Sequence, residues 1–236
     1  MKYFIILTIL ISSLTFAKNE NANTNEDIYL TDRAFEKKYI NKLKSIKYLS
    51  LAYYESKDLH EKMFLIKRLT DFLNDNDAFN TVIDAVNEEL PEKGNGDLYW
   101  KIRASAIYLL GEKAINLPNN KKIIILQNLV NRFKTDKKYL VIAASAFTLV
   151  KLATDNPNTK SDHRLLNKRT IANLFSDRIL NLNHHENYLC WALSKASMRL
   201  GDPLTRYALI EARKKPFNRR VLSEIQKSIN FLSKIK

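Results

Sequence analysis

Apolar residues recur along this chain every three or four positions, with polar residues between them. That period places the apolar side chains on one face of an α-helix. The clearest stripes are Leu98–Leu109, Ile142–Ala153 and Leu189–Leu200. We expect the first to end at Gly111 and the third at Gly201, which begins the helix-stopping sequence Gly-Asp-Pro. The pattern therefore predicts an all-α protein whose helices are separated by short breakers.

Further stripes of the same period cover most of the remaining chain. They lie at residues 35–46, 66–73, 82–90, 123–133, 171–182 and 222–232, with a short helix expected at 204–212. The expected helices after residue 97 come in pairs. The segment Pro91–Asp97 is rich in glycine and polar residues, and it is the best candidate for a boundary inside the chain.

One short sequence recurs at intervals of about 40 to 50 residues. It reads IRASAIYLLGEKA at 102–114, IAASAFTLVKLA at 142–153 and ALSKASMRLGDP at 192–203. Its alanines and serines allow a helix to approach its neighbours closely. A single helical hairpin cannot cover its own apolar face, but stacking against the next hairpin buries that face. The recurrence therefore favours a stacked array of hairpins.

This recurring pattern resembles the HEAT-repeat family, whose units are antiparallel helix pairs of about 40–47 residues. The resemblance implies a right-handed α-solenoid of HEAT-like hairpins over residues 97–236, with a surface for protein partners. Residues 28–96 are expected to add further hairpins or a separate helical cap. The alternative is a compact helical bundle, in which small residues at close helix crossings serve the same purpose.

The N-terminal residues have the pattern of an export signal. Residues 1–17 contain Lys2, an apolar run from Tyr3 to Leu14 and small residues before a polar switch, so we predict a cleaved signal peptide. The alternative is a retained N-terminal membrane anchor, although the run is shorter than the roughly 20 residues of a spanning helix. The polar segment 18–27 is expected to be disordered. The protein is thus expected in the periplasm or cell envelope.

The composition excludes several classes of protein. Only 4 glycines occur in 236 residues, whereas β-rich folds and phosphate-binding loops need glycine for their turns. Cys190 is the only cysteine, so no internal disulfide can form. Stability must therefore come from packing.

The net charge of +14 is concentrated in the C-terminal part of the chain. Residues 18–97 carry 12 Lys and Arg against 16 Asp and Glu, whereas residues 98–203 carry 17 against 7 and residues 204–236 carry 9 against 2. Such a distribution favours anionic partners, because charge governs steering and association rather than fold.

No pattern of catalytic or metal-binding residues is evident. His184 and His185 are adjacent, so on a helix they would point about 100° apart and could not chelate one metal as an i, i+4 pair does. We expect Cys190 to be buried and the paired carboxylates Glu88 and Glu89 to be solvated. We therefore predict no catalytic residue, no metal and no cofactor. Trp100 and Trp191 are expected to pack between repeats, with a ligand platform as the alternative.

The strongest candidate for binding is the basic stretch at 211–220. Its candidate anion- or partner-binding residues are Arg213, Lys214, Lys215, Phe217, Arg219 and Arg220. Cations gathered at a helix break can bind phosphates, carboxylates or lipid headgroups, and Phe217 could stack or insert. The alternative is a solvated polar cap at the end of the array.

Two functional hypotheses follow. The first is an exported, non-enzymatic scaffold that binds another protein. The second is a module that binds an anionic polymer or an anionic membrane surface through the basic C-terminal half. We expect neither a specific nucleic acid nor a small-molecule substrate.

Overall fold

The computed structural model describes residues 24–39, 45–89, 98–154 and 167–235. Within these residues the chain is all-helical, with 80% helix and no strand, and its helices pack in contact. The predicted fold class is confirmed to this extent. The chain divides into two compact units, residues 1–41 and 42–236, which are described separately below.

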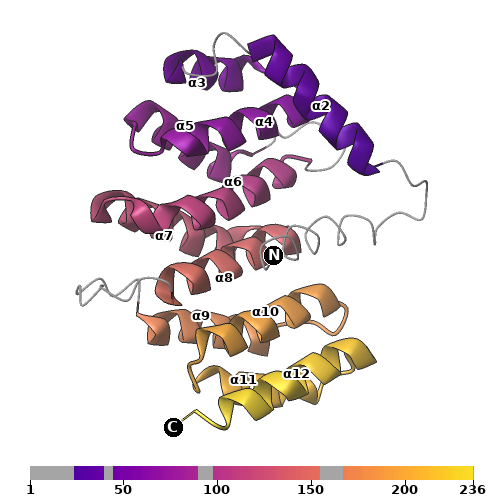
Figure 1. Ribbon diagram of the computed structural model, residues 1–236. Coiled ribbons are helices and arrows are strands. Elements are labelled where there is room, and N and C mark those ends of the chain that lie inside the picture. Colours follow the sequence, from indigo (N-terminus) through magenta and orange to yellow (C-terminus); the bar gives the residue numbers. More distant parts are fainter. Residues whose placement is uncertain (1–23, 40–44, 90–97, 155–166, 236) are drawn as a thin grey trace. The chain divides into compact units, whose positions relative to one another are not determined.

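The described residues form eleven α-helices and two short 3₁₀ helices (Figure 1). Their bounds are α2 Thr24–Tyr39, α3 Ile46–Glu55, α4 Leu59–Leu69, η1 Thr70–Phe72, α5 Asn76–Asn87, α6 Trp100–Lys113, η2 Ala114–Asn116, α7 Asn119–Thr135, α8 Tyr139–Thr154, α9 Lys168–Leu180, α10 Asn187–Leu200, α11 Thr205–Arg213 and α12 Arg219–Leu232. None of these helices is long and apolar enough to cross a lipid bilayer.

The first unit contributes one described helix, α2, which begins earlier than expected. Thr24–Asp27 form its first turn, although we expected the segment 18–27 to be disordered. The rest of that segment, and the predicted signal peptide at 1–17, lie outside the described residues.

The expected single stripe at 35–46 corresponds to two helices. Helix α2 ends at Tyr39, and α3 begins at Ile46 after Ser45, whose backbone is extended. The sequence interpretation missed α3, because its tyrosines and leucines are not arranged in one clear stripe. On α3, Leu49 and Tyr53 are buried whereas Leu51 and Tyr54 are exposed.

In the second unit, each helix packs against the next helix in the chain, against the next helix but one, or against both. Helix α6 packs on α8, α8 on α10 and α10 on α12, while α7 contacts α8, α9 contacts α11 and α11 contacts α12. Helices α4 and α5 both pack on α6. The helices before and after the predicted boundary Pro91–Asp97 are therefore in contact, although that segment itself lies outside the described residues.

The small residues of the recurring sequence lie in the core. Ala106, Ala146 and Ala196 are fully buried, and so is Ser145. They occupy equivalent positions on α6, α8 and α10, the helices that pack successively on one another. Their small volume therefore allows these helices to approach closely.

The two glycines of this motif have different roles. Gly201 adopts a left-handed backbone with φ 69° and follows Leu200, the last residue of α10, as the predicted stop signal requires. Gly111, by contrast, does not end α6, which continues to Lys113. A Cβ atom at Gly111 would lie 2.9 Å from both Cγ2 and Oγ1 of Thr148 on α8. Gly111 therefore permits the close contact between α6 and α8.

We expect Gly111→Ala to lower the free energy of unfolding by about 1–2 kcal/mol, because overpacking against Thr148 outweighs the better helix propensity of alanine. In a Thr148→Ala background only the Cβ atom remains nearby, at 3.4 Å, so the same change should be neutral or stabilising there. Urea denaturation of the four proteins measures both effects. An equal loss in the two backgrounds would contradict this account of Gly111.

Two cations of α7 donate hydrogen bonds to backbone carbonyl groups near the ends of earlier helices. Lys121 of α7 donates to the carbonyl oxygens of Leu73, Asn74 and Asp75 at 3.0, 2.9 and 3.3 Å. Arg132, also on α7, donates to the carbonyl of Asn87 at the end of α5 at 3.1 Å. The Asp75 carbonyl also accepts a hydrogen bond from the backbone N–H of Phe79 in α5, at 3.1 Å. The hydrogen bonds from Lys121 and Arg132 therefore connect neighbouring helix pairs. Two of the protein's cations thus stabilise the fold.

Candidate anion-binding surface

The basic stretch at 211–220 connects α11 to α12, and its six candidate residues lie in different environments. Lys214 donates to both carboxylate oxygens of Glu211, at 2.7 and 2.9 Å, and this hydrogen bonding raises the pKa of Lys214. Lys215 donates to the carbonyls of Leu180 and Leu182, at 2.6 and 2.7 Å, at the end of α9. Two of the five cations therefore have partners inside the chain. The other three, Arg213, Arg219 and Arg220, are exposed.

The expectation that Phe217 stacks on a ligand or inserts into one is wrong. Its side chain is 4% exposed and belongs to the core. It precedes Asn218, whose side chain accepts a hydrogen bond from the backbone N–H of Val221 and so caps α12. An apolar residue just before a helix cap commonly packs inward and fixes how the chain enters the helix. Phe217 therefore has a structural role.

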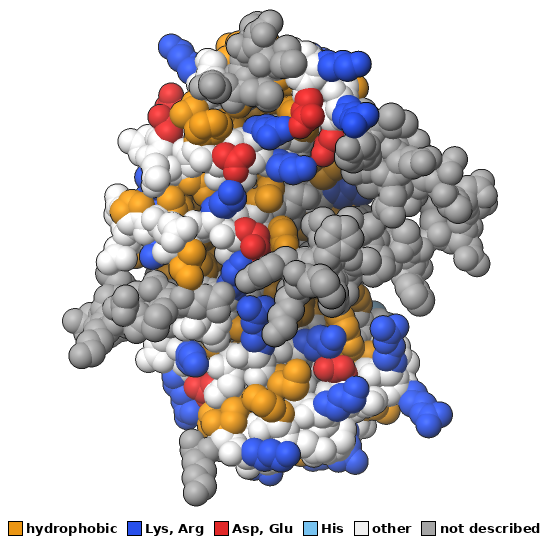
Figure 2. Space-filling view, viewed as in Figure 1, with side chains coloured by type: hydrophobic (Ala, Val, Ile, Leu, Met, Phe, Trp, Pro, Cys, Tyr) orange, Lys and Arg blue, Asp and Glu red, His pale blue; other side chains and the backbone are white. Residues whose placement is uncertain are grey.

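Arg219 and Arg220 instead belong to a pocket between α10 and α12. The pocket has a volume of about 550 Å³ and is lined by Trp191 and Lys195 from α10 and by Arg219, Arg220, Ser223, Glu224 and Lys227 from α12. Four of these seven residues are cations and one is an acid. On the face shown in Figure 2, several Lys and Arg side chains lie over the region formed by α10–α12, with apolar side chains between them. The pocket thus offers several positive charges to one ligand.

Helix geometry explains why these residues meet. Trp191 and Lys195 are four residues apart on α10. On α12, Glu224 lies four residues after Arg220, and Lys227 lies three residues after Glu224. Each set therefore shares one helix face. The opposite face of α12 is apolar and buries Ile225, which leaves the polar face to solvent. Packing of α10 on α12 then brings the two polar faces together.

Aromatic side chains continue the pocket toward the start of α8. The Trp191 and Tyr188 ring centroids are 5.8 Å apart, and those of Tyr188 and Tyr139 are 5.2 Å apart. The Nζ atom of Lys195 lies 4.3 Å from the Trp191 ring centroid, within the range of a cation–π interaction. The sequence predicts that Trp191 packs between repeats or forms a ligand platform. It does not predict Lys195 or Lys227 as residues of the site. The only available signal was their helical spacing from Trp191 and Arg220.

The structure also places the other residues that were considered for chemistry. His184 and His185 are exposed in the turn before α10, and the described residues contain no group of three or more His, Cys, Asp or Glu side chains arranged to hold a metal ion. Cys190 is fully buried, as predicted, and burial raises the pKa of its thiol to about 12. The thiol therefore remains protonated and out of contact with solvent.

A second polar cluster lies where α4, α5 and α6 meet. The Glu88 carboxylate accepts hydrogen bonds from Lys62, at 2.5 Å, and from the Tyr53 hydroxyl. Burial raises the pKa of Glu88 to about 7, and the nearby charge of Arg103 opposes this shift. The expectation that Glu88 is solvated is therefore wrong, whereas Glu89 is exposed. The polar atoms of this cluster bind one another, which is typical of a structural network.

Comparison with known proteins adds no further assignment. No protein family, curated protein or solved structure matches this chain.

Proposed function

We propose that this chain is an exported, non-enzymatic helical-repeat protein, a right-handed α-solenoid of HEAT-like hairpins, that binds a partner protein through the α10–α12 pocket. The observation that carries the proposal is the succession of contacts from α6 to α8, α10 and α12 through buried small residues. That succession is what stacked repeats require, since each unit covers the apolar face of the next. Repeat arrays of this kind offer long surfaces for partners.

The charge of the pocket supports an acidic partner. Lys195, Arg219, Arg220 and Lys227 surround it with Glu224 as the one opposing charge. Electrostatic complementarity of this kind accelerates association and selects partners of opposite charge. The proposal includes no catalytic step. The cations of the pocket serve to bind an anionic group, and the Cys190 thiol is buried, away from any substrate.

Capture from cell-envelope fractions tests the proposal. A variant with Lys195→Glu, Arg220→Glu and Lys227→Glu should lose the proteins that the unaltered chain retains, because each cation becomes a repulsive charge. The matched control reverses three exposed cations elsewhere, Lys134, Lys137 and Arg206. Quantitative mass spectrometry identifies what each protein retains. The proposal is contradicted if nothing is retained, or if the pocket variant and the control retain the same proteins.

Export is tested separately, because the predicted signal peptide lies outside the described residues. We expect the mature chain to begin at Lys18 and to appear in the envelope or periplasmic fraction. Terminal sequencing after fractionation measures both properties. A chain that retains Met1 in the cytoplasm would remove the export part of the proposal.

The second candidate function is binding of an anionic polymer or an anionic membrane surface, which the net charge of residues 98–236 favours. Such binding weakens steeply with salt, because bound cations displace many counterions. Retention on heparin and on phosphatidylglycerol vesicles, measured across a salt series, tests this candidate. Equal retention of the pocket variant and the unaltered chain would exclude the pocket as the site of such binding.

A further inference from the structure

We infer that the α10–α12 pocket binds an extended acidic peptide segment in which carboxylates alternate with neutral hydrogen-bonding residues. The inference rests on the proposed function, since that segment would belong to the partner protein. It is drawn from three features of the pocket: the fixed position of Lys195, the spacing of the cations on α12, and the carboxylate of Glu224 between them.

Lys195 is held in place before any ligand arrives. Its Nζ atom lies over the Trp191 ring at 4.3 Å, and Trp191 itself packs against Tyr188. A charge that is already ordered loses little conformational freedom when a ligand binds, which strengthens the interaction. The ammonium group also occupies one face of the indole ring. That arrangement favours contact with a carboxylate over stacking of a nucleic acid base on the ring.

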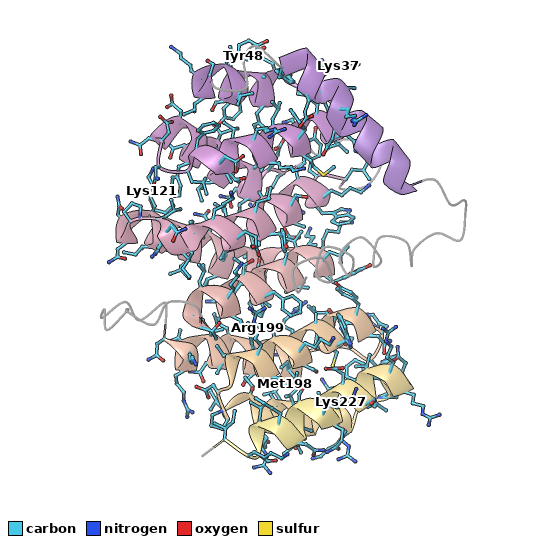
Figure 3. All side chains as sticks on the ribbon, in the orientation of Figure 1. Lys37, Tyr48, Lys121, Met198, Arg199 and Lys227 are labelled. Atoms are coloured by element: carbon cyan, nitrogen blue, oxygen red, sulfur yellow. The ribbon has the colours of Figure 1, made fainter. Side chains whose placement is uncertain are left out.

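The cations of α12 are spread along the helix. Arg220 and Lys227 are seven residues apart, which corresponds to about 10 Å along the helix axis. Successive side chains on one face of an extended peptide are about 7 Å apart, so two or three acidic residues span this distance. An elongated ligand with several carboxylates therefore matches the row of cations better than a single small anion does. In Figure 3, Lys227 marks this part of α12, and Met198 and Arg199 mark the neighbouring helix α10.

The Glu224 carboxylate favours binding of an acidic peptide over binding of a uniform polyanion. Its carboxylate lines the same pocket and lies between Arg220 and Lys227 on α12. A polymer with a negative group at every unit would place a like charge against Glu224, which is unfavourable. A backbone N–H group of an extended peptide, between two acidic side chains that share one face, can instead donate a hydrogen bond to that carboxylate. The position of Glu224 thus selects against nucleic acids, polyphosphate and densely charged membranes.

Fluorescence anisotropy with defined probes tests the inference. The probes are a labelled peptide of five Glu-Ser repeats, the same peptide with Gln in place of Glu, and labelled inorganic polyphosphate. We expect saturable binding of the Glu-Ser peptide and none of the Gln-Ser peptide. Lys195→Gln and Arg220→Gln should each weaken the Glu-Ser peptide at least about tenfold through loss of a charge-assisted hydrogen bond. The matched control Lys134→Gln should leave its affinity unchanged.

Glu224→Gln provides the decisive comparison between ligand classes. It should tighten polyphosphate binding by at least about threefold, because it removes a like charge, while the affinity for the Glu-Ser peptide changes less than about twofold. Polyphosphate that binds the unaltered chain more tightly than the peptide, with no response to Glu224→Gln, would overturn the inference. Absence of saturable peptide binding would overturn it as well.

Different experimental results would contradict the peptide ligand and the proposed function. If reversal of the pocket charges abolishes partner capture but the Glu-Ser peptide does not bind, the ligand is of another kind and the proposed function stands. If partner capture survives that reversal, the α10–α12 pocket is not the partner surface, and the proposed function is contradicted in its choice of site.

Discussion

Replacement of Arg103 by leucine is expected to lower the free energy of unfolding by about 3–5 kcal/mol, the usual effect of breaking a buried ion pair from one side. The Arg103 and Asp136 side chains are 4% and 1% exposed. Arg103 donates to the two carboxylate oxygens of Asp136 at 2.8 and 3.3 Å, and to the carbonyl of Glu88 at 2.9 Å. The substitution leaves the buried Asp136 carboxylate with the backbone N–H of Lys138, at 2.8 Å, and with the more distant Arg132 guanidinium, at 3.9 Å.

The size of this loss should depend on pH. Arg103 lowers the pKa of Glu88, which burial has raised to about 7, so its removal raises that pKa further. A carboxyl group with a raised pKa in the folded state stabilises the fold at low pH, and that contribution is lost as the pH rises through the folded-state value. The destabilisation should therefore be larger at pH 7.5 than at pH 5.

Lys113→Leu is the matched control for this prediction. Lys113 and Asp71 form an ion pair of nearly the same length, 2.9 Å, but their side chains are 48% and 47% exposed. Exposed pairs contribute about 0–1 kcal/mol, so this change should have little effect at either pH. Urea denaturation of both variants at pH 5 and pH 7.5 measures the difference. Equal losses from the two substitutions would show that Arg103 has no special structural role.

The helices and one of their end signals could be predicted from sequence because both depend on local interactions. Apolar spacing locates α4 to α12, and Gly201 ends α10 through its own backbone conformation. The role of Gly111 depends on Thr148, which lies 37 positions away in the chain and comes close only when α6 packs on α8. Similarly, the pairing of Arg103 with Asp136 joins residues that no sequence pattern connects. The roles of Gly111 and Arg103 therefore depend on contacts between helices and could not be predicted from the local sequence pattern.

The same distinction applies to the binding surface. The charge of residues 211–220 was evident from the sequence, but its division between structural and exposed cations was not. Lys215 binds carbonyls of α9, and Phe217 is buried before α12, whereas Arg219 and Arg220 face the pocket. Lys195 lies on α10 and becomes part of the pocket only through the contact of α10 with α12. A charged segment in sequence thus predicted the region of the site but only part of its composition.

Phe175→Ala is expected to lower the free energy of unfolding by about 3–5 kcal/mol, since it removes a large aromatic side chain from a fully buried position. Phe175 lies on α9, and its ring centroid is 5.4 Å from that of Phe133 on α7. The pair joins two successive helix pairs. Phe231→Ala on α12 is the matched control, because that side chain is 47% exposed and its loss should cost no more than about 0.5 kcal/mol.

The Phe175 variant also distinguishes a stacked array from a compact bundle. In an array, helices beyond the weakened contact should open at lower urea concentration than those before it. Cys190 reports on α10, because its buried thiol reacts only after opening, and Trp100 fluorescence in a Trp191→Phe background reports on α6. We expect the midpoint of Cys190 labelling to fall further than the midpoint of the Trp100 signal. Midpoints that fall together would indicate one cooperative bundle and would contradict the proposed solenoid.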